Sequence, residues 1–275
     1  MKLMDYSIYF VPTPIGNLED MTIRAINVLK NVDIIACEDT RESKKLLNYF
    51  DINKKLTSYH KFNEKQKSEE IIKNVKEGVT YAIITDQGMP GISDPGHILI
   101  RECIKENISY TVLPGPSSIL TALIASGFDN DRFSFYGFIP KKNSDKKKLY
   151  EELEKENKTS ILFDTPHNLE NTINDFKKIF PQRKLAITRE LSKKFEQYQI
   201  FKIDDINTEN LTFKGEFVLI LEKNKREENL DISSYKDDIL KMKKEGESTK
   251  DIVKSLKKST PFSKNEIYDF VISLD

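Results

Sequence analysis

The sequence predicts an α/β protein with two α/β domains and a helical tail. Up to about residue 116, five apolar segments of strand length alternate with amphipathic helices, which is typical of a parallel α/β domain. After that, several strands follow one another without long helices between them, which indicates a mixed sheet. No strand pattern appears beyond Lys225. We therefore expect domains at 1–118 and 119–224, followed by a helical tail at 225–275.

The central feature of the first domain is a long loop after a buried strand. The apolar run Val79–Thr85 ends at Asp86, and the loop 86–96 (DQGMPGISDPG) contains three glycines and two prolines before a helix begins at His97. Prolines restrict the backbone, whereas glycines allow positive φ or close approach of another molecule. Long ordered loops are usually functional, so we expect a ligand here.

The other strands of the first domain are also followed by polar segments. The sequence leaves two functions open for each of three polar segments. The EDTR segment either caps a helix or takes part in catalysis, and His60 is either structural or catalytic. Ser117-Ser118 is either a helix cap or a cradle for a carboxylate or ribose. These strands and segments are 6–12 with the turn 13–18 (TPIGNL), 33–37 with 38–41 (EDTR), 56–59 with 60–64 (HKFNE), and 110–113 with 114–118 (PGPSS).

The second domain begins after the apolar helix 119–127. Its expected strands are 133–138, 160–164, 184–188, 195–203 and 215–222, with a basic run between Lys141 and Lys148. The expected helices of the tail are 239–244, 249–256 and 264–274. The tail is rich in lysine, and it is either a second RNA contact or a solvated helical appendage.

Several classes of function are disfavoured by what the sequence lacks. It has neither GxGxxG nor a phosphate-binding P-loop, so a nucleoside triphosphate or NAD is a poor candidate. Cys37 and Cys103 are expected to be buried free thiols, and no Cys/His cluster has zinc-ligand spacing, so we predict no metal. No apolar run reaches the ~18 residues of a membrane span, and the N-terminus has no signal-peptide pattern. We therefore expect a cytoplasmic protein without membrane contact. Lys plus Arg equals Asp plus Glu, 44 each, so nucleic-acid binding has to rest on local patches.

A set of motifs resembles the tetrapyrrole-methylase superfamily, in particular its members that act on ribosomal RNA. The motifs are VPTPIGNLEDMTIRA, EDTR, HKFNE, DQGMPGISDPG, LPGPSS and GFIPKK, and the resemblance runs from Tyr6 to about Glu222. It implies a class III methyltransferase fold with S-adenosylmethionine in the cleft between two α/β domains, usually in a homodimer. The implied reaction is methylation of a cytidine ribose 2′-hydroxyl in the decoding region of 16S ribosomal RNA, on the free RNA or the small ribosomal subunit.

The resemblance also implies where the two substrates bind. On the donor side lie Pro12, Asp86, Met89, Pro90, Ser117, Ser118, Phe163 and Ala186. On the acceptor side, the candidate catalytic residues are Glu38, Arg41, His60, Arg189 and Glu190, with Asp39 beside them. The two arginines suit phosphate, and Glu38 or His60 suits the hydroxyl proton, although structural ion pairs explain the same residues equally well.

Three positions depart from the usual family pattern. Gln87 and Met89 replace alanine and threonine in the central loop, and Asn168 stands where an arginine is usual. Two alternatives therefore stay open: a precorrin-type methyltransferase with a small tetrapyrrole substrate, and a catalytically inactive ribosome-binding adaptor. The PTPIGNL and EDTR motifs and the lysine run favour RNA over a tetrapyrrole, and donor binding separates an enzyme from an adaptor.

Overall fold

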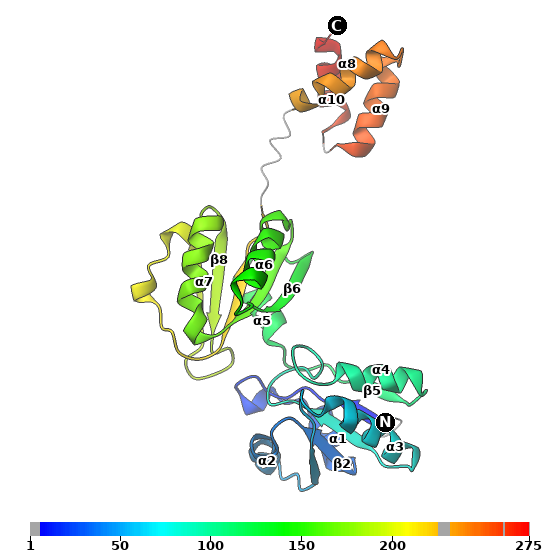
Figure 1. The fold of residues 1–275 in the computed structure, drawn as a ribbon, viewed down its shortest axis with the longest axis vertical. Coiled ribbons are helices and arrows are strands. Elements are labelled where there is room, and N and C mark those ends of the chain that lie inside the picture. Colours follow the sequence, from blue (N-terminus) through cyan, green and yellow to red (C-terminus); the bar gives the residue numbers. More distant parts are fainter. Residues whose placement is uncertain (1–5, 225–231, 261, 275) are drawn as a thin grey trace. The chain divides into compact units, whose positions relative to one another are not determined.

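The computed structural model of the chain describes residues 6–224, 232–260 and 262–274 (Figure 1). The chain divides into two compact units, residues 1–224 and 225–275, and each is described by itself. Within the first unit, the name first lobe is used for residues 6–118 and second lobe for residues 119–224, following the predicted domain boundary.

The first lobe is built on a parallel sheet of five strands. They are β1 (Ile8–Phe10), β2 (Ile34–Cys37), β3 (Lys55–Ser58), β4 (Tyr81–Ile84) and β5 (Tyr110–Val112), in the order β3-β2-β4-β1-β5. Every neighbouring pair is parallel. The predicted parallel α/β architecture is confirmed, and the carboxyl ends of all five strands lie at one edge.

Helices cover both faces of the first sheet because its strands are apolar on both sides. Helices α1 (Ile23–Asn31) and α2 (Thr40–Tyr49) share a core with Tyr9 and Val11. Helices α3 (Glu64–Lys76) and α4 (His97–Lys105) share the opposite core with Ile8 and Phe10. The predicted burial of both cysteines is confirmed: Cys37 lies in the first core and Cys103 in the second, both as free thiols.

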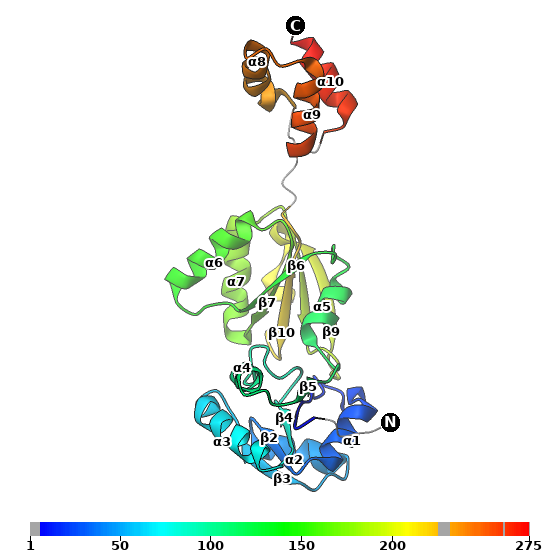
Figure 2. The same ribbon diagram turned by 90° about the vertical axis from the view of Figure 1, so that its right-hand side faces the viewer.

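The second lobe has a mixed sheet between two helical layers, as Figure 2 shows. Its strands are β6 (Phe133–Phe138), β7 (Thr159–Asp164), β8 (Lys184–Arg189), β9 (Gln197–Lys202) and β10 (Phe217–Leu221), in the order β6-β7-β10-β8-β9. Helix α5 (Ser118–Ser126) packs on one face, and α6 (Asn143–Lys155) and α7 (Pro166–Ile179) pack on the other. Short 3-10 helices occur at Ile203–Asp205 and Thr208–Asn210 in this lobe and at Leu18–Asp20 in the first lobe.

The direction of β10 decides which residues meet at the edge of the second sheet. It runs antiparallel to both β7 and β8, so Phe217 pairs with Asp164 and with Arg189. The start of β10 therefore lies beside the ends of β7 and β8. One residue of the first lobe, Ile15 in the PTPIGNL turn, is buried in the core that α5 forms with this sheet.

The unit 225–275 is helical over its described residues. It contains a 3-10 turn (Ile232–Tyr235), α8 (Lys236–Lys244), α9 (Thr249–Ser259) and α10 (Lys264–Ser273), in agreement with the predicted tail. A small core of Ile239, Ile252, Ile267 and neighbouring apolar residues joins the helices. Across the described ranges of the chain, no helix has the length and apolar character needed to cross a bilayer.

Candidate active site in the cleft between two sheets

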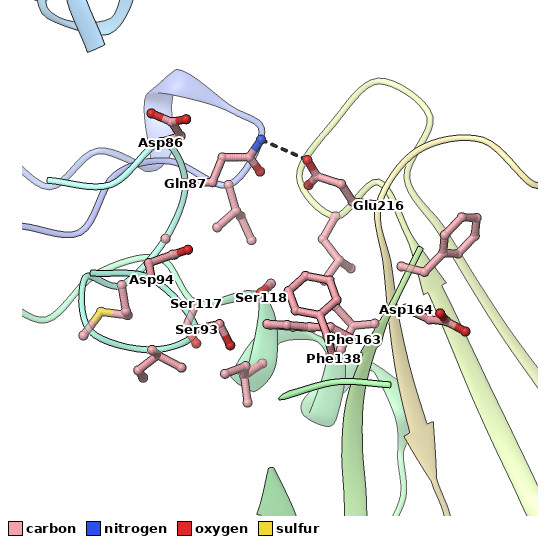
Figure 3. Close-up of a pocket in the computed structure, with 18 of the residues that line it drawn as sticks. Asp86, Gln87, Ser93, Asp94, Ser117, Ser118, Phe138, Phe163, Asp164 and Glu216 are labelled. Atoms are coloured by element: carbon pink, nitrogen blue, oxygen red, sulfur yellow. Dashed lines mark hydrogen bonds between the residues drawn. The ribbon is translucent and has the colours of Figure 1, made fainter. Parts of the chain in front are cut away.

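A cavity of about 470 Å³ lies in the first unit, between the strand ends of the two sheets (Figure 3). This volume falls within the usual range for small-molecule sites. The first lobe contributes the end of β2, the loop 86–96 and the Ser117-Ser118 turn, and the second lobe contributes the ends of β6 and β7 and the start of β10. Figure 3 shows Asp86 and Asp94 on one side and Phe138 and Phe163 on the other.

The loop 86–96 is held in place by its backbone. Thr13 and Gly88 exchange two hydrogen bonds of 3.0 Å, which tie the PTPIGNL turn to the loop. At the far end, Gly91 N–H donates to the Pro95 carbonyl at 3.1 Å. Gly96 has φ +146°, and a Cβ there would lie 2.9 Å from Gly91 N, so only glycine fits. The loop is therefore a preformed wall of the cavity.

A buried carboxylate fixes the point where this loop becomes α4. The side chain of Glu64, in the HKFNE motif, accepts hydrogen bonds from Gly96 N–H at 2.8 Å and Ile98 N–H at 3.3 Å. Tyr59 Oη donates to the same oxygen at 3.2 Å. Gly96 offers no side chain to cap the helix, so a residue distant in sequence performs that function.

Three acidic side chains of the first lobe line the cavity: Glu38, Asp86 and Asp94. Partial burial and the neighbouring Glu38 and Asp86 raise the pKa of Asp94 to about 7. Burial and the charge of Asp86 raise the pKa of Glu38, while burial and then Asp39 raise that of Asp86. Like charges disfavour one another's ionisation. This end of the cavity therefore favours a cation, and Asp94 accepts a proton near neutral pH.

The residues of the EDTR segment at the end of β2 have different positions: one lines the cavity and another caps helix α2. Asp39 is the N-cap of α2, and its carboxylate accepts from Arg41 N–H at 2.8 Å. The guanidinium of Arg41 also pairs with Asp39 at 2.8 Å, and these hydrogen bonds hold the pKa of Asp39 well below its usual range. Glu38 alone of the segment lines the cavity, whereas Arg41 points to solvent with its side chain 86% exposed.

His60 and the Arg189-Glu190 pair lie outside the cavity lining. His60 is close enough for its charge to oppose the rise in the pKa of Glu38, and its Nδ1 is buried without a hydrogen-bond partner in the part of the chain that the structure describes. Arg189 donates to the carbonyls of Lys214 and Phe195, at 2.5 and 3.1 Å. Glu190 accepts from Glu216 N–H at 3.0 Å. Their catalytic roles stay predictions.

The predicted donor-side residues fall into two groups. The cavity lining contains Asp86, Met89, Ser117, Ser118 and Phe163. The remaining three, Pro12, Pro90 and Ala186, are buried outside it. Pro12 packs where a Cβ on Gly115 would be, 2.7 Å away, and Ala186 lies within the core under α5. Ser117 caps α5 by accepting from Leu120 N–H at 3.4 Å.

Several lining residues were not singled out from the sequence. Asp94 belongs to the central loop, so the loop motif itself was the available signal, and Gln87 stood out there only as a departure from the family pattern. Phe138 ends β6, and Glu216 precedes β10, which runs antiparallel to its neighbours. The Gln87 amide donates to the Glu216 carboxylate at 3.1 Å, so the unusual Gln87 joins the two lobes across the cleft (Figure 3).

Asn168, the other polar departure, supports a buried acid at the end of β7. Its amide donates to Asp164 Oδ1 at 2.8 Å and to Thr172 Oγ1 at 3.0 Å. Asp164 lines the cavity and is 5% exposed, and its Oδ2 has no hydrogen-bond partner among residues 6–224. Among the described residues, no group of three or more His, Cys, Asp or Glu side chains is arranged to hold a metal ion.

The fold and the cleft define a protein of two α/β lobes with one cavity shared by their strand ends. The chain belongs to the Tetrapyrrole (Corrin/Porphyrin) Methylases, a methyltransferase family that matches residues 7–207. A solved structure described as diphthine synthase has a similar fold, with a TM-score of 0.64 and 12% identity over 78% of this chain and 89% of that one.

More similar relatives are proteins named ribosomal RNA small subunit methyltransferase I. The one from Halalkalibacterium halodurans is 44% identical over 79% of this chain and 76% of its own length. The one from Bacillus subtilis is 38% identical over 95% of this chain and 92% of its own length.

Proposed function

We propose that the chain is an S-adenosylmethionine-dependent methyltransferase that methylates the 2′-hydroxyl of a cytidine ribose in the decoding region of 16S ribosomal RNA. The observation that carries the proposal is the cleft, in which acids from one lobe and aromatic rings from the other line a single cavity. The names of relatives that align with 95% of the chain support ribosomal RNA as the substrate. We place the reaction in the cytoplasm, where small subunits assemble.

The residues of the cavity fit S-adenosylmethionine by their chemistry. The donor carries a positive sulfonium and an ammonium group, which suit the acidic end formed by Glu38, Asp86 and Asp94. Phe138 and Phe163, whose ring centroids lie 5.2 Å apart, offer an aromatic wall for an adenine ring. The hydroxyls of Ser117 and Ser118 lie at the start of α5, where a carboxylate is favoured. When bound, the donor supplies an electrophilic methyl group.

The remaining requirement is an acceptor hydroxyl with a base beside it. A ribose hydroxyl is a weak nucleophile, so its proton has to pass to a base during transfer. Glu38 lines the cavity and His60 is near enough to affect its pKa, so either suits that role, and Asp94 adds a third acceptor with a pKa of about 7. The rigid loop 86–96 contributes by fixing the positions of these groups before substrates bind.

Two further features extend the proposal to partners. Helix α5 has no charged residue, and it leaves Leu120 and Ile124 50% and 72% exposed. A helix that is apolar on all sides is normally buried, so we propose that a second copy of the chain covers it in a homodimer. The lysines of the helical tail, including Lys241 and Lys250, supply a further contact for RNA phosphates.

The experiment is transfer of labelled methyl from S-adenosylmethionine to small ribosomal subunits that lack the modification, followed by nuclease mapping. We expect label on a cytidine 2′-oxygen in subunits, with naked 16S RNA as the comparison substrate. Label on a precorrin and none on RNA would instead support a tetrapyrrole methyltransferase, the activity class suggested by the fold neighbour described as uroporphyrin-III-C-methyltransferase. If the protein does not bind S-adenosylmethionine at all, the result would support a catalytically inactive ribosome-binding adaptor.

A further inference from the structure

The turn after β3 presents Phe62 almost completely to solvent. Its 96% exposure is the highest of any large hydrophobic residue in the described ranges, and Ile23 follows at 79%. Single exposed apolar residues are common, so exposure alone assigns no role. Three further features of this turn indicate a binding role for Phe62: its fixed backbone, its position near the cavity and the cations beside it.

Hydrogen bonds hold the Phe62 turn in one conformation. The side chain of Asn63 accepts from His60 N–H at 2.8 Å and donates to the Ser58 carbonyl at 3.2 Å. The backbone N–H of Asn63 also donates to the His60 carbonyl at 2.9 Å. Next in the chain comes Glu64, whose carboxylate is anchored to the start of α4. An aromatic ring on so fixed a backbone loses little entropy when it contacts a partner.

The Phe62 turn lies at the same sheet edge as the cavity. Strand β3 pairs with β2 up to Cys37 and Ser58, and the backbone N–H of Tyr59 continues the pairing to the Cys37 carbonyl at 2.8 Å. Glu38, which follows Cys37, lines the cavity. The ring of His60 connects the two places: it affects the pKa of Glu38, and its centroid is 6.0 Å from that of Phe62 at an interplanar angle of 67°.

Cationic side chains flank the exposed ring. Lys61 precedes Phe62, and Lys65 lies in the first turn of α3; both are exposed. Within residues 6–224, neither ammonium group forms an ion pair with a carboxylate within 4.0 Å. An exposed aromatic ring with unpaired cations close to it in sequence is the chemistry that binds single-stranded nucleic acid, because bases stack on the ring and phosphates meet the cations. A protein partner would require a wider apolar surface.

We propose that Phe62 stacks on an unpaired base of the RNA substrate next to the nucleotide in the cleft, while Lys61 and Lys65 contact the adjoining phosphates. This inference rests on the proposed function and assigns a site for the neighbouring nucleotide. Stacking requires a flat aromatic ring, so a tyrosine at position 62 retains RNA binding and a leucine does not.

The first test measures methyl transfer to small subunits by Phe62→Ala, Phe62→Leu and Phe62→Tyr. We expect kcat/KM for the subunits to fall about tenfold in the alanine and leucine variants and to stay near wild type in the tyrosine variant. Donor affinity, measured by calorimetry, stays unchanged in all three. Ile104→Ala is the matched control, because Ile104 is 61% exposed near the end of α4, which leads toward the opposite edge of the first sheet.

The second test uses the absence of tryptophan from the chain. Phe62→Trp provides a single tryptophan, which can be excited at wavelengths where the eleven tyrosines do not absorb, and stacking on a base quenches its fluorescence. We expect quenching when an oligocytidylate of about eight nucleotides binds, followed in parallel by anisotropy of a label on the RNA. Ile104→Trp shows no quenching in the same titration.

The outcomes separate this inference from the proposed function. A wild-type enzyme that methylates no ribosomal RNA refutes the proposed function and the stacking site with it. An active wild type, with a leucine variant as active as the tyrosine variant, refutes stacking alone. Stacking is also refuted if the oligocytidylate binds, as its anisotropy shows, but leaves the fluorescence of Phe62→Trp unchanged.

Discussion

Asp86 stands at the point where the central strand β4 ends and the cavity begins. Besides lining the cavity, it accepts a hydrogen bond from Asp39 N–H at 3.2 Å and so joins the ends of β4 and β2. Its carboxylate has no cationic partner within 4.0 Å in the described part of the first unit. A negative charge left unpaired at a cavity favours a cationic ligand.

Replacement of Asp86 by alanine is expected to lower affinity for S-adenosylmethionine by at least about tenfold, because a charge-assisted contact is lost. Isothermal titration calorimetry measures the change. Asp131→Ala removes an exposed carboxylate outside the cavity lining and serves as the control. Wild-type affinity in Asp86→Ala would remove this residue from the donor site.

Asp94 makes the stability of the protein depend on pH. Its pKa is about 7 in the folded chain against an ordinary value of 3.8, so folding favours its neutral form. The contribution of neutral Asp94 to the free energy of unfolding is fully present below about pH 4. It is lost as the pH rises toward 7, because the folded protein then has to hold an ionised carboxylate in a partly buried site. Asp94→Asn abolishes this loss, so the variant is more stable than wild type by about 1 kcal/mol or more above pH 7, and the gain shrinks as pH falls toward 4.

Thermal unfolding of Asp94→Asn and wild type between pH 4 and pH 8 measures this effect. Asp204→Asn, which changes an exposed acid, is the control. A stability gain that stays constant across the whole pH range would contradict the explanation, because it would not follow the titration of Asp94.

Sequence reasoning located the cavity more readily than it located the individual side chains. The loop after β4 and the Ser117-Ser118 turn stood out because they follow parallel strands, whose carboxyl ends share an edge. The family resemblance then assigned Asp86, Met89, Ser117 and Ser118 to the donor side, and all four line the cavity. That rule does not reach Glu216, because it precedes a strand that runs the other way. The rule also fails to distinguish Glu38 from Arg41. Both follow the same strand, but the side chain of Glu38 lines the cavity whereas that of Arg41 points to solvent.

At the scale of elements, the HKFNE segment and the central loop act together. Glu64 is 6% exposed and accepts three hydrogen bonds on one oxygen, two of them from the start of α4. This contact spans 32 residues of sequence, so no local pattern indicates it. The helices themselves were predicted well because their apolar periodicity is local.

Glu64→Ala is expected to lower the free energy of unfolding by about 3 kcal/mol, because buried backbone donors lose their acceptor. It also weakens donor binding, since the loop 86–96 loses the anchor at its end. Urea unfolding and calorimetry measure the two effects. Glu69→Ala, an exposed change on the same helix, should affect neither. Unchanged stability in Glu64→Ala would mean that water replaces the carboxylate without loss.

The order and directions of the strands were less accessible than the positions of the strands and helices. The predicted strand 195–203 begins two residues too early, because Glu196 N–H is used in a turn with the Lys193 carbonyl and β9 starts at Gln197. The sequence indicated a mixed second sheet, and the structure confirms it. The order β6-β7-β10-β8-β9 depends on contacts between distant strands, which a local pattern does not encode.

At the scale of the whole molecule, the exposed apolar residues of α5 predict self-association. Ile124→Lys places a charge on the surface proposed for the dimer, and it is expected to shift the protein from dimer to monomer at micromolar concentration. Sedimentation velocity measures the change, and Ile104→Lys is the matched control. A wild type that sediments as a monomer throughout this range would contradict the homodimer.

The burial of Ile15 in the core of the second lobe has a consequence for local opening of the chain. Ile15 belongs to the first lobe in sequence, and the Thr13–Gly88 pairing ties its turn to the central loop. When the second sheet unfolds, this turn loses its hydrophobic anchor, so the segment 13–18 opens with a sheet more than a hundred residues away. Amide hydrogen exchange in these residues therefore follows the exchange of β10 rather than that of β1.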